Sequence, residues 1–172
     1  VLSGTGVKLF LRPADREVFE TVLGSAGVFG GFLYHMFSPD GQWIAFTAGS
    51  SIKKSSVFGG TPVVVGDAGS QPRGLWWGSD QNIYYGHVNG PINRVSENGG
   101  GATAVTTLDS ASGEISHRFP ALLPDGKSVL YTIKFNTITT FDEAAIAVRD
   151  MNSGETKVLI RGGTYGRYVP TG

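Results

Sequence analysis

The most constraining feature of this sequence is a strand–turn–strand pattern that recurs along the chain. Its clearest copy is Phe37 to Phe46 (FSPDGQWIAF), in which Pro presets a turn, Asp bonds its own backbone and Gly accepts a positive φ. Similar stretches follow at 76–85 and 122–131, and a shortened copy begins at Tyr168. The turn positions 39, 79, 124 and 170 lie 40, 45 and 46 residues apart, a period typical of propeller blades.

Each repeat is predicted to contain four short antiparallel strands. The strand Trp43 to Ala48 is largely apolar on both faces, so it must be covered from both sides, as in blades that stack face to face. The most helix-like window, Thr140 to Val148, is interpreted as a loop followed by a strand. The predicted strands are 7–12, 17–22, 34–37, 43–48, 52–57, 62–65, 74–77, 82–87, 92–96, 102–107, 119–123, 128–134, 145–150 and 156–160.

The sequence therefore predicts an all-β propeller built from about four four-stranded antiparallel blade repeats, an excerpt of a larger ring. We divide its single repeat domain, 1–172, into a partial blade at 1–31, repeats at 32–70, 71–114 and 115–163, and the first strand of a further blade at 164–172.

Composition narrows the classes of partner. The 172 residues include 14 basic and 14 acidic ones with no run of like charge, so neither nucleic acid nor an anionic membrane is favoured. Cysteine is absent, which excludes disulfides and thiolate metal sites. No apolar run is long enough to span a bilayer, so no membrane insertion is expected.

The stretch Ser38 to Phe46, followed by the Gly59-Gly60 turn, resembles the TolB-like, PD-type propeller repeat. Residues 59–172 especially resemble the WD-like propeller regions attached to some bacterial serine/threonine kinases. The resemblance implies a protein-docking or ligand-sensing role, periplasmic or otherwise outside the cytoplasm of a bacterium. One departure is Gly78-Ser79-Asp80-Gln81 in place of Ser-Pro-Asp-Gly, so this turn is expected to differ in detail.

Enzymatic activity is not expected from these residues. The chain lacks a Gly-x-Ser-x-Gly elbow and the strand–helix alternation that would hold one. The three histidines are too scattered for a metal site, and no phosphate cradle or other cofactor site is recognised. We expect a non-catalytic binding scaffold. The alternatives are an accessory propeller of a peptidase or kinase whose catalytic part lies elsewhere, and a structural repeat fragment without a ligand.

Two arginines stand at equivalent repeat positions, six residues before the turn marker. Arg73 and Arg118 both enter first strands, so they are predicted to meet at one mouth of a central channel and to hold a small anion or a peptide terminus. His35 and His117 also precede or enter first strands and are candidate channel residues. The structural alternatives are an inter-blade salt bridge for the arginines and a hydrogen-bonded packing role for the histidines.

Self-association is expected because the repeat pattern begins and ends within a blade. The chain starts near the end of one strand and stops just after a first strand, so the outermost blades are predicted to expose apolar faces and unpaired edges. Two copies that exchange these strands would complete a ring with two-fold symmetry. We therefore predict a homodimer or another closed oligomer.

Overall fold

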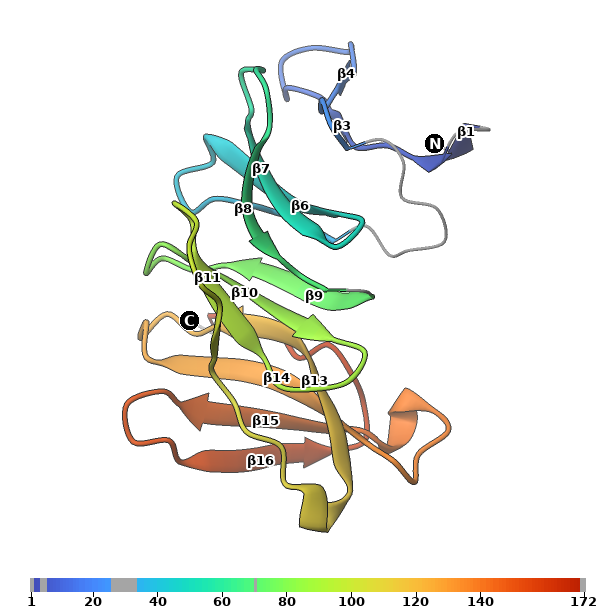
Figure 1. The fold of residues 1–172 in the computed structure, drawn as a ribbon, viewed down its shortest axis with the longest axis vertical. Helices are drawn as coiled ribbons and strands as arrows, with labels where there is room; N and C mark the ends of the chain where they lie inside the picture. Colours follow the sequence, from blue (N-terminus) through green and yellow to red (C-terminus); the bar gives the residue numbers. More distant parts are fainter. Residues whose placement is uncertain (1, 4–5, 26–33, 70, 171–172) are drawn as a thin grey trace.

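In the described part of the chain, three four-stranded antiparallel sheets follow one another and stack face to face (Figure 1). The computed structural model describes residues 2–3, 6–25, 34–69 and 71–170. We call the sheets blades 1, 2 and 3; in each, the strands lie side by side in chain order. Their bounds are β5 (His35–Phe37), β6 (Trp43–Ala48), β7 (Ser51–Ser56), β8 (Val63–Asp67); β9 (Pro72–Trp77), β10 (Asn82–His87), β11 (Asn93–Ser96), β12 (Thr103–Ala104); β13 (Glu114–Leu122), β14 (Ser128–Phe135), β15 (Ala145–Asp150), β16 (Thr156–Arg161).

The N-terminal part forms two small strand pairs in place of the predicted long hairpin. β1 (Leu2–Ser3) pairs with β2 (Gly6–Val7), and β3 (Phe10–Leu11) pairs with β4 (Glu20–Thr21). The predicted strands 7–12 and 17–22 were therefore too long. Val18 and Phe19 are 67% and 65% exposed, so no sheet face covers the second half of the expected hairpin.

The turn chemistry explains the recurring Asp. In the first copy the Asp40 Oδ1 accepts the Gln42 N–H at 3.0 Å, and Gly41 has a φ of 70°. In the second copy the turn is one residue shorter, and Gln81 takes the left-handed conformation with a φ of 64°. The sequence departure at Gly78 to Gln81 thus changes the length of the turn and preserves its shape.

Successive residues of the second strands point to opposite neighbours, as strand geometry requires. Ile83 and Tyr85 belong to the core between blades 1 and 2, whereas Tyr84 belongs to the core between blades 2 and 3. All three side chains are at most 2% exposed. The central strand of blade 2 is therefore buried on both faces, which confirms the expected face-to-face packing.

Trp43 departs from the expectation that the strand 43–48 is buried on both faces. Ile44 to Thr47 of the same strand are buried, but Trp43 is only half-buried and lines an open hollow. The strand enters the sheet at Trp43, so its side chain stands at the rim of the blade.

The described part of the chain contains two one-turn 3₁₀ helices. Phe141–Glu143 opens the segment that was interpreted as a loop, and β15 follows it as expected. Ser110–Ser112 was not predicted; the Asp109 side chain accepts the N–H groups of Ala111 and Ser112, and Gly113 ends the turn with a φ of 79°. Among the described residues no helix is long and apolar enough to cross a membrane.

Candidate functional site at the inner strands

The first strands of the three blades lie side by side, because β9 contacts β5 on one side and β13 on the other. This brings Arg73 of β9 and Arg118 of β13 together. A methyl group on Gly86 would lie 2.8 Å from the Arg73 carbonyl oxygen and 3.1 Å from the Arg118 Cα, so both backbones converge on one point. The equivalent Leu33 lies outside the described residues, and the fourth equivalent position carries Thr164.

Arg118 is 6% exposed and is held by neutral oxygens. Its Nε donates to Ser116 Oγ at 2.8 Å and its Nη2 to the Val88 carbonyl at 2.8 Å. Among the described residues no acidic side chain forms an ion pair with it. Burial, and next the like charge of Arg73, lower the pKa of Arg118.

Arg73 is half-buried and shares this region with Tyr34. Its guanidinium donates to the Pro72 carbonyl at 2.9 Å and to Gln71 Oε1 at 3.4 Å. Burial raises the pKa of the Tyr34 phenol, and the positive charges of Arg73 and Arg118 oppose this shift. Two guanidinium groups are thus close enough to affect the same phenol.

Four aromatic rings lie close to one another beside Arg118. The Phe119 ring lies 6.4 Å from that of Tyr34, 6.4 Å from that of Phe141 and 5.0 Å from that of Tyr165, measured between centroids. The Arg118 guanidinium carbon is 5.1 Å from the Phe141 centroid. We call Arg73, Arg118 and these four aromatic residues the inner-strand cluster.

The aromatic members of the cluster were not predicted from the sequence, although the repeat contains a signal for them. Counting back five residues from each turn marker gives Tyr34, Gly74, Phe119 and Tyr165. Gly74 has no side chain, so the rings of blades 1 and 3 meet across blade 2. Phe119 and Tyr165 have φ values of 53° and 62°, unusual for aromatic residues, and Gly74 has 98°.

His117 does not join this cluster. It is fully buried; its Nδ1 lies 2.7 Å from Thr106 Oγ1 and its Nε2 3.0 Å from Glu114 Oε2. The order hydroxyl–imidazole–carboxylate resembles a catalytic triad, but Thr106 is 2% exposed and its oxygen already accepts the Ile92 N–H. A substrate has no access to this hydroxyl. Burial lowers the pKa of His117, and the bond to Glu114 opposes the shift.

His35 lies exposed in β5, and within the described part of the chain no hydrogen bond, ion pair or ring contact links it to the arginines. The four candidate residues therefore separate into a pair that the fold brings together and two histidines elsewhere. Across the described residues, no group of three His, Cys, Asp or Glu side chains is arranged to hold a metal ion.

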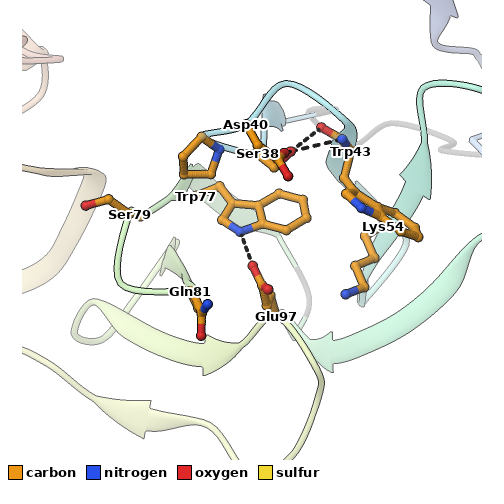
Figure 2. Close-up of a pocket in the computed structure, with 10 residues that line it drawn as sticks. Ser38, Asp40, Trp43, Lys54, Trp77, Ser79, Gln81 and Glu97 are labelled. Atoms are coloured by element: carbon orange, nitrogen blue, oxygen red, sulfur yellow. Dashed lines mark hydrogen bonds between the residues drawn. The ribbon is translucent and has the colours of Figure 1, made fainter.

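A second polar site lies between the turn ends of blades 1 and 2. It is an open hollow of about 240 Å³. Figure 2 shows residues of blade 1 along one wall and residues of blade 2 along the other. The residues that line the hollow include Asp40, Trp43, Lys54, Trp77, Ser79, Gln81 and Glu97.

Solved structures share this architecture. TolB from Acinetobacter baumannii superposes with a TM-score of 0.66 at 17% identity, over 88% of this chain and 37% of that protein. A protein described as a putative TolB, from Agrobacterium tumefaciens, superposes with a TM-score of 0.62 at 20% identity, over 82% of this chain and 55% of that protein. The chain has a TolB-like β-propeller-type fold. The tricorn protease also superposes, with a TM-score of 0.65 at 12% identity over 90% of this chain and 15% of the protease.

The TolB-like chain spans 55% or less of each of these three proteins. No protein-family model matches it, and no curated protein does. At these identities the similarity concerns the fold. The special likeness to propellers attached to kinases stays a prediction from the sequence.

Proposed function

We propose that the TolB-like chain is a non-catalytic binding module whose inner-strand cluster holds a carboxylate at the end of an apolar peptide segment. The observation that carries the proposal is the pairing of Arg73 with Arg118. Bringing two guanidinium groups together costs electrostatic free energy, and neutral oxygens compensate the buried charge of Arg118 only in part. An anion bound between the two would offset both costs.

The aromatic rings define the rest of the ligand. Tyr165 is 45% exposed, and Phe119 and Phe141 are half-buried, so apolar ring surface stays accessible beside the arginines. Aromatic and Arg side chains are the residue types that dominate binding energy at protein interfaces. A peptide carboxylate with an apolar last residue satisfies both parts of the cluster.

The non-catalytic character is supported by the burial of the Thr106–His117–Glu114 set, which no substrate reaches. The fold similarity to the tricorn protease carries no catalytic residue to this chain. Generic ester and peptide substrates are expected to be hydrolysed no faster than in buffer.

Calorimetric titration tests the binding proposal, with N-acetylated peptides that end in an apolar residue as probes. The same peptides with an amidated C-terminus serve as ligand controls. The Arg73→Gln variant is expected to bind the free-acid peptide about ten-fold more weakly, since a charge-assisted contact is lost. Arg161→Gln, which removes one charge from exposed β16, is the matched protein control and is expected to bind normally. Equal affinity for acid and amide peptides would overturn the proposal.

We also propose that a second copy of the chain is a partner. Leu159 and Ile160 of edge strand β16 are 49% and 58% exposed, and Tyr168 and Val169 are 55% and 68% exposed. Exposed apolar strand edges promote association. Sedimentation at micromolar concentration is expected to give a multiple of 18.2 kDa. A folded species of 18.2 kDa across that range would exclude this partner.

A further inference from the structure

The hollow between blades 1 and 2 has a specific origin in the sequence. Ala45 of β6 and Tyr84 of β10 occupy equivalent positions, and each faces the next blade. Tyr84 fills the space between blades 2 and 3, where its hydroxyl donates to Asp80 Oδ2 at 2.6 Å and lies 3.6 Å from Met151 Sδ. Ala45 is too short to do the same between blades 1 and 2.

The residue that faces this space from blade 2 also differs from its equivalent in blade 3. Glu97 is the blade 2 equivalent of Met151, because both donate their backbone N–H to the preceding turn, to Gln81 O at 2.9 Å and to Lys127 O at 2.8 Å. The interface between blades 2 and 3 is therefore filled by the Tyr84 phenol and the Met151 thioether. The interface between blades 1 and 2 has the Ala45 methyl group and the Glu97 carboxylate instead, which leaves the hollow open and polar.

Opposite charges lie on the two walls. Lys54 of β7 extends past Trp43, with its Nζ 5.1 Å from the centroid of the indole (Figure 2). Across the hollow, Glu97 Oε2 accepts the Trp77 Nε1–H at 2.8 Å. Within the described part of the chain, Lys54 and Glu97 form no ion pair with each other. Both charges remain available to a ligand that fits between them.

We propose that this hollow binds a small zwitterion of amino-acid size, with its carboxylate at Lys54 and its ammonium group at Glu97. Asp40 adds a second negative charge at the rim, and Ser79 and Gln81 offer further hydrogen-bonding groups. The volume of about 240 Å³ lies below that of a drug-sized site and, at about 30 Å³ per liquid water, equals roughly eight water molecules. A ligand of amino-acid size matches this space.

The three tryptophans provide a direct readout by NMR. Trp43 and Trp77 line the hollow, whereas Trp76 packs elsewhere, with the Arg167 guanidinium carbon 5.1 Å from its ring centroid. Glycine, L-alanine and L-serine at millimolar concentration are expected to shift the indole N–H signals of Trp43 and Trp77 and to leave that of Trp76 in place. Trp→Phe variants assign the three signals.

Chemical and protein controls make the test specific. N-acetyl-L-alanine lacks the ammonium group and L-alanine methyl ester lacks the carboxylate, so each is expected to bind about ten-fold more weakly. Lys54→Met and Glu97→Gln are expected to weaken L-alanine binding by a similar factor. Lys53→Met, which changes the adjacent residue on the other face of β7, is expected to have no effect.

Three results would overturn the proposal: no shift of the Trp43 and Trp77 signals with any zwitterion, equal shifts of all three indoles, or equal binding of the blocked derivatives. These outcomes are separate from those for the inner-strand cluster, which lies at the first strands of the blades.

Discussion

Gly74 and Phe119 lie backbone to backbone where the first strands of blades 2 and 3 meet. A methyl group on the Gly74 α-carbon would lie 2.6 Å from Phe119 Cα and 2.8 Å from Phe119 N. Gly74 also has a φ of 98°, a conformation that only glycine adopts without strain. This contact sets the distance between the strands that carry Arg73 and Arg118.

Gly74→Ala is therefore expected to destabilise the fold by about 2–4 kcal/mol, since the new methyl group meets main chain that has no room to move. Urea denaturation measures the change. Gly100→Ala is the matched control: Gly100 has a φ of 120° with open space around it, so only the backbone strain of about 1–2 kcal/mol applies. Equal losses in the two variants would show that the contact with Phe119 contributes nothing.

Tyr84 is expected to be a main stabilising residue between blades 2 and 3. Tyr84→Phe removes the hydroxyl that bonds Asp80 and should cost about 1–2 kcal/mol, because the Asp80 oxygen loses a donor. Tyr84→Leu should cost more, since it opens a cavity beside Leu122 and Tyr131. A Tyr84→Phe protein as stable as the wild type would contradict the assigned bond.

Trp43 and Trp77 form a second matched pair. Trp77 is 4% exposed, so Trp77→Ala is expected to cost about 3–5 kcal/mol in a denaturant melt. Trp43→Ala is expected to cost only about 1–2 kcal/mol, because its half-buried ring borders solvent in the hollow. The reverse order of the two losses would mean that the position of Trp43 in the blade is wrong.

The stability of the fold is expected to fall when the pH drops below about 6.5, the ordinary pKa of histidine. Burial lowers the pKa values of His117 and His87 in the folded state, so the unfolded chain binds protons first and folding is disfavoured as pH falls. Around His117 the charged groups are Glu114, which opposes this shift, and Arg149, which adds to it.

Urea melts between about pH 7.5 and about pH 5, roughly the range in which histidine titrates, measure this slope. His117→Gln is expected to reduce this slope, because it removes a histidine whose pKa is lowered by burial in the folded state. A wild-type unfolding free energy that is constant across this range would contradict the burial of neutral His117.

Strand positions were predictable because each depends on a local pattern of turn residues and alternating apolar residues. The segments 43–48, 82–87 and 145–150 coincide with β6, β10 and β15. The strands expected at 7–12 and 17–22 were too long, since their pairing depends on a packed neighbour that Val18 and Phe19 do not have. Local propensity alone does not contain that information.

The sites were predictable only in part. The repeat spacing brought out Arg73 and Arg118, because equivalent positions on neighbouring blades are close in space. It gave no indication that His117 points into a buried network with Thr106 and Glu114, since side-chain direction depends on the irregular pairing of β13 near Arg118. The hollow between blades 1 and 2 was not predictable from the sequence. Recognising it requires knowing that Ala45 and Tyr84 occupy equivalent positions and that both side chains face the next blade.

The proposed binding of a carboxylate by Arg73 and Arg118 together can be tested by observing the two side chains themselves. In a ¹⁵N-labelled protein, the Nε–Hε signals of both arginines should shift together, with one saturation curve, on titration with an N-acetylated peptide that ends in an apolar residue. The signal of Arg161 on exposed β16 should stay in place. Unmoved signals of Arg73 and Arg118 at saturating peptide, or shifts of all arginines in parallel, would contradict the binding of a carboxylate by these two residues.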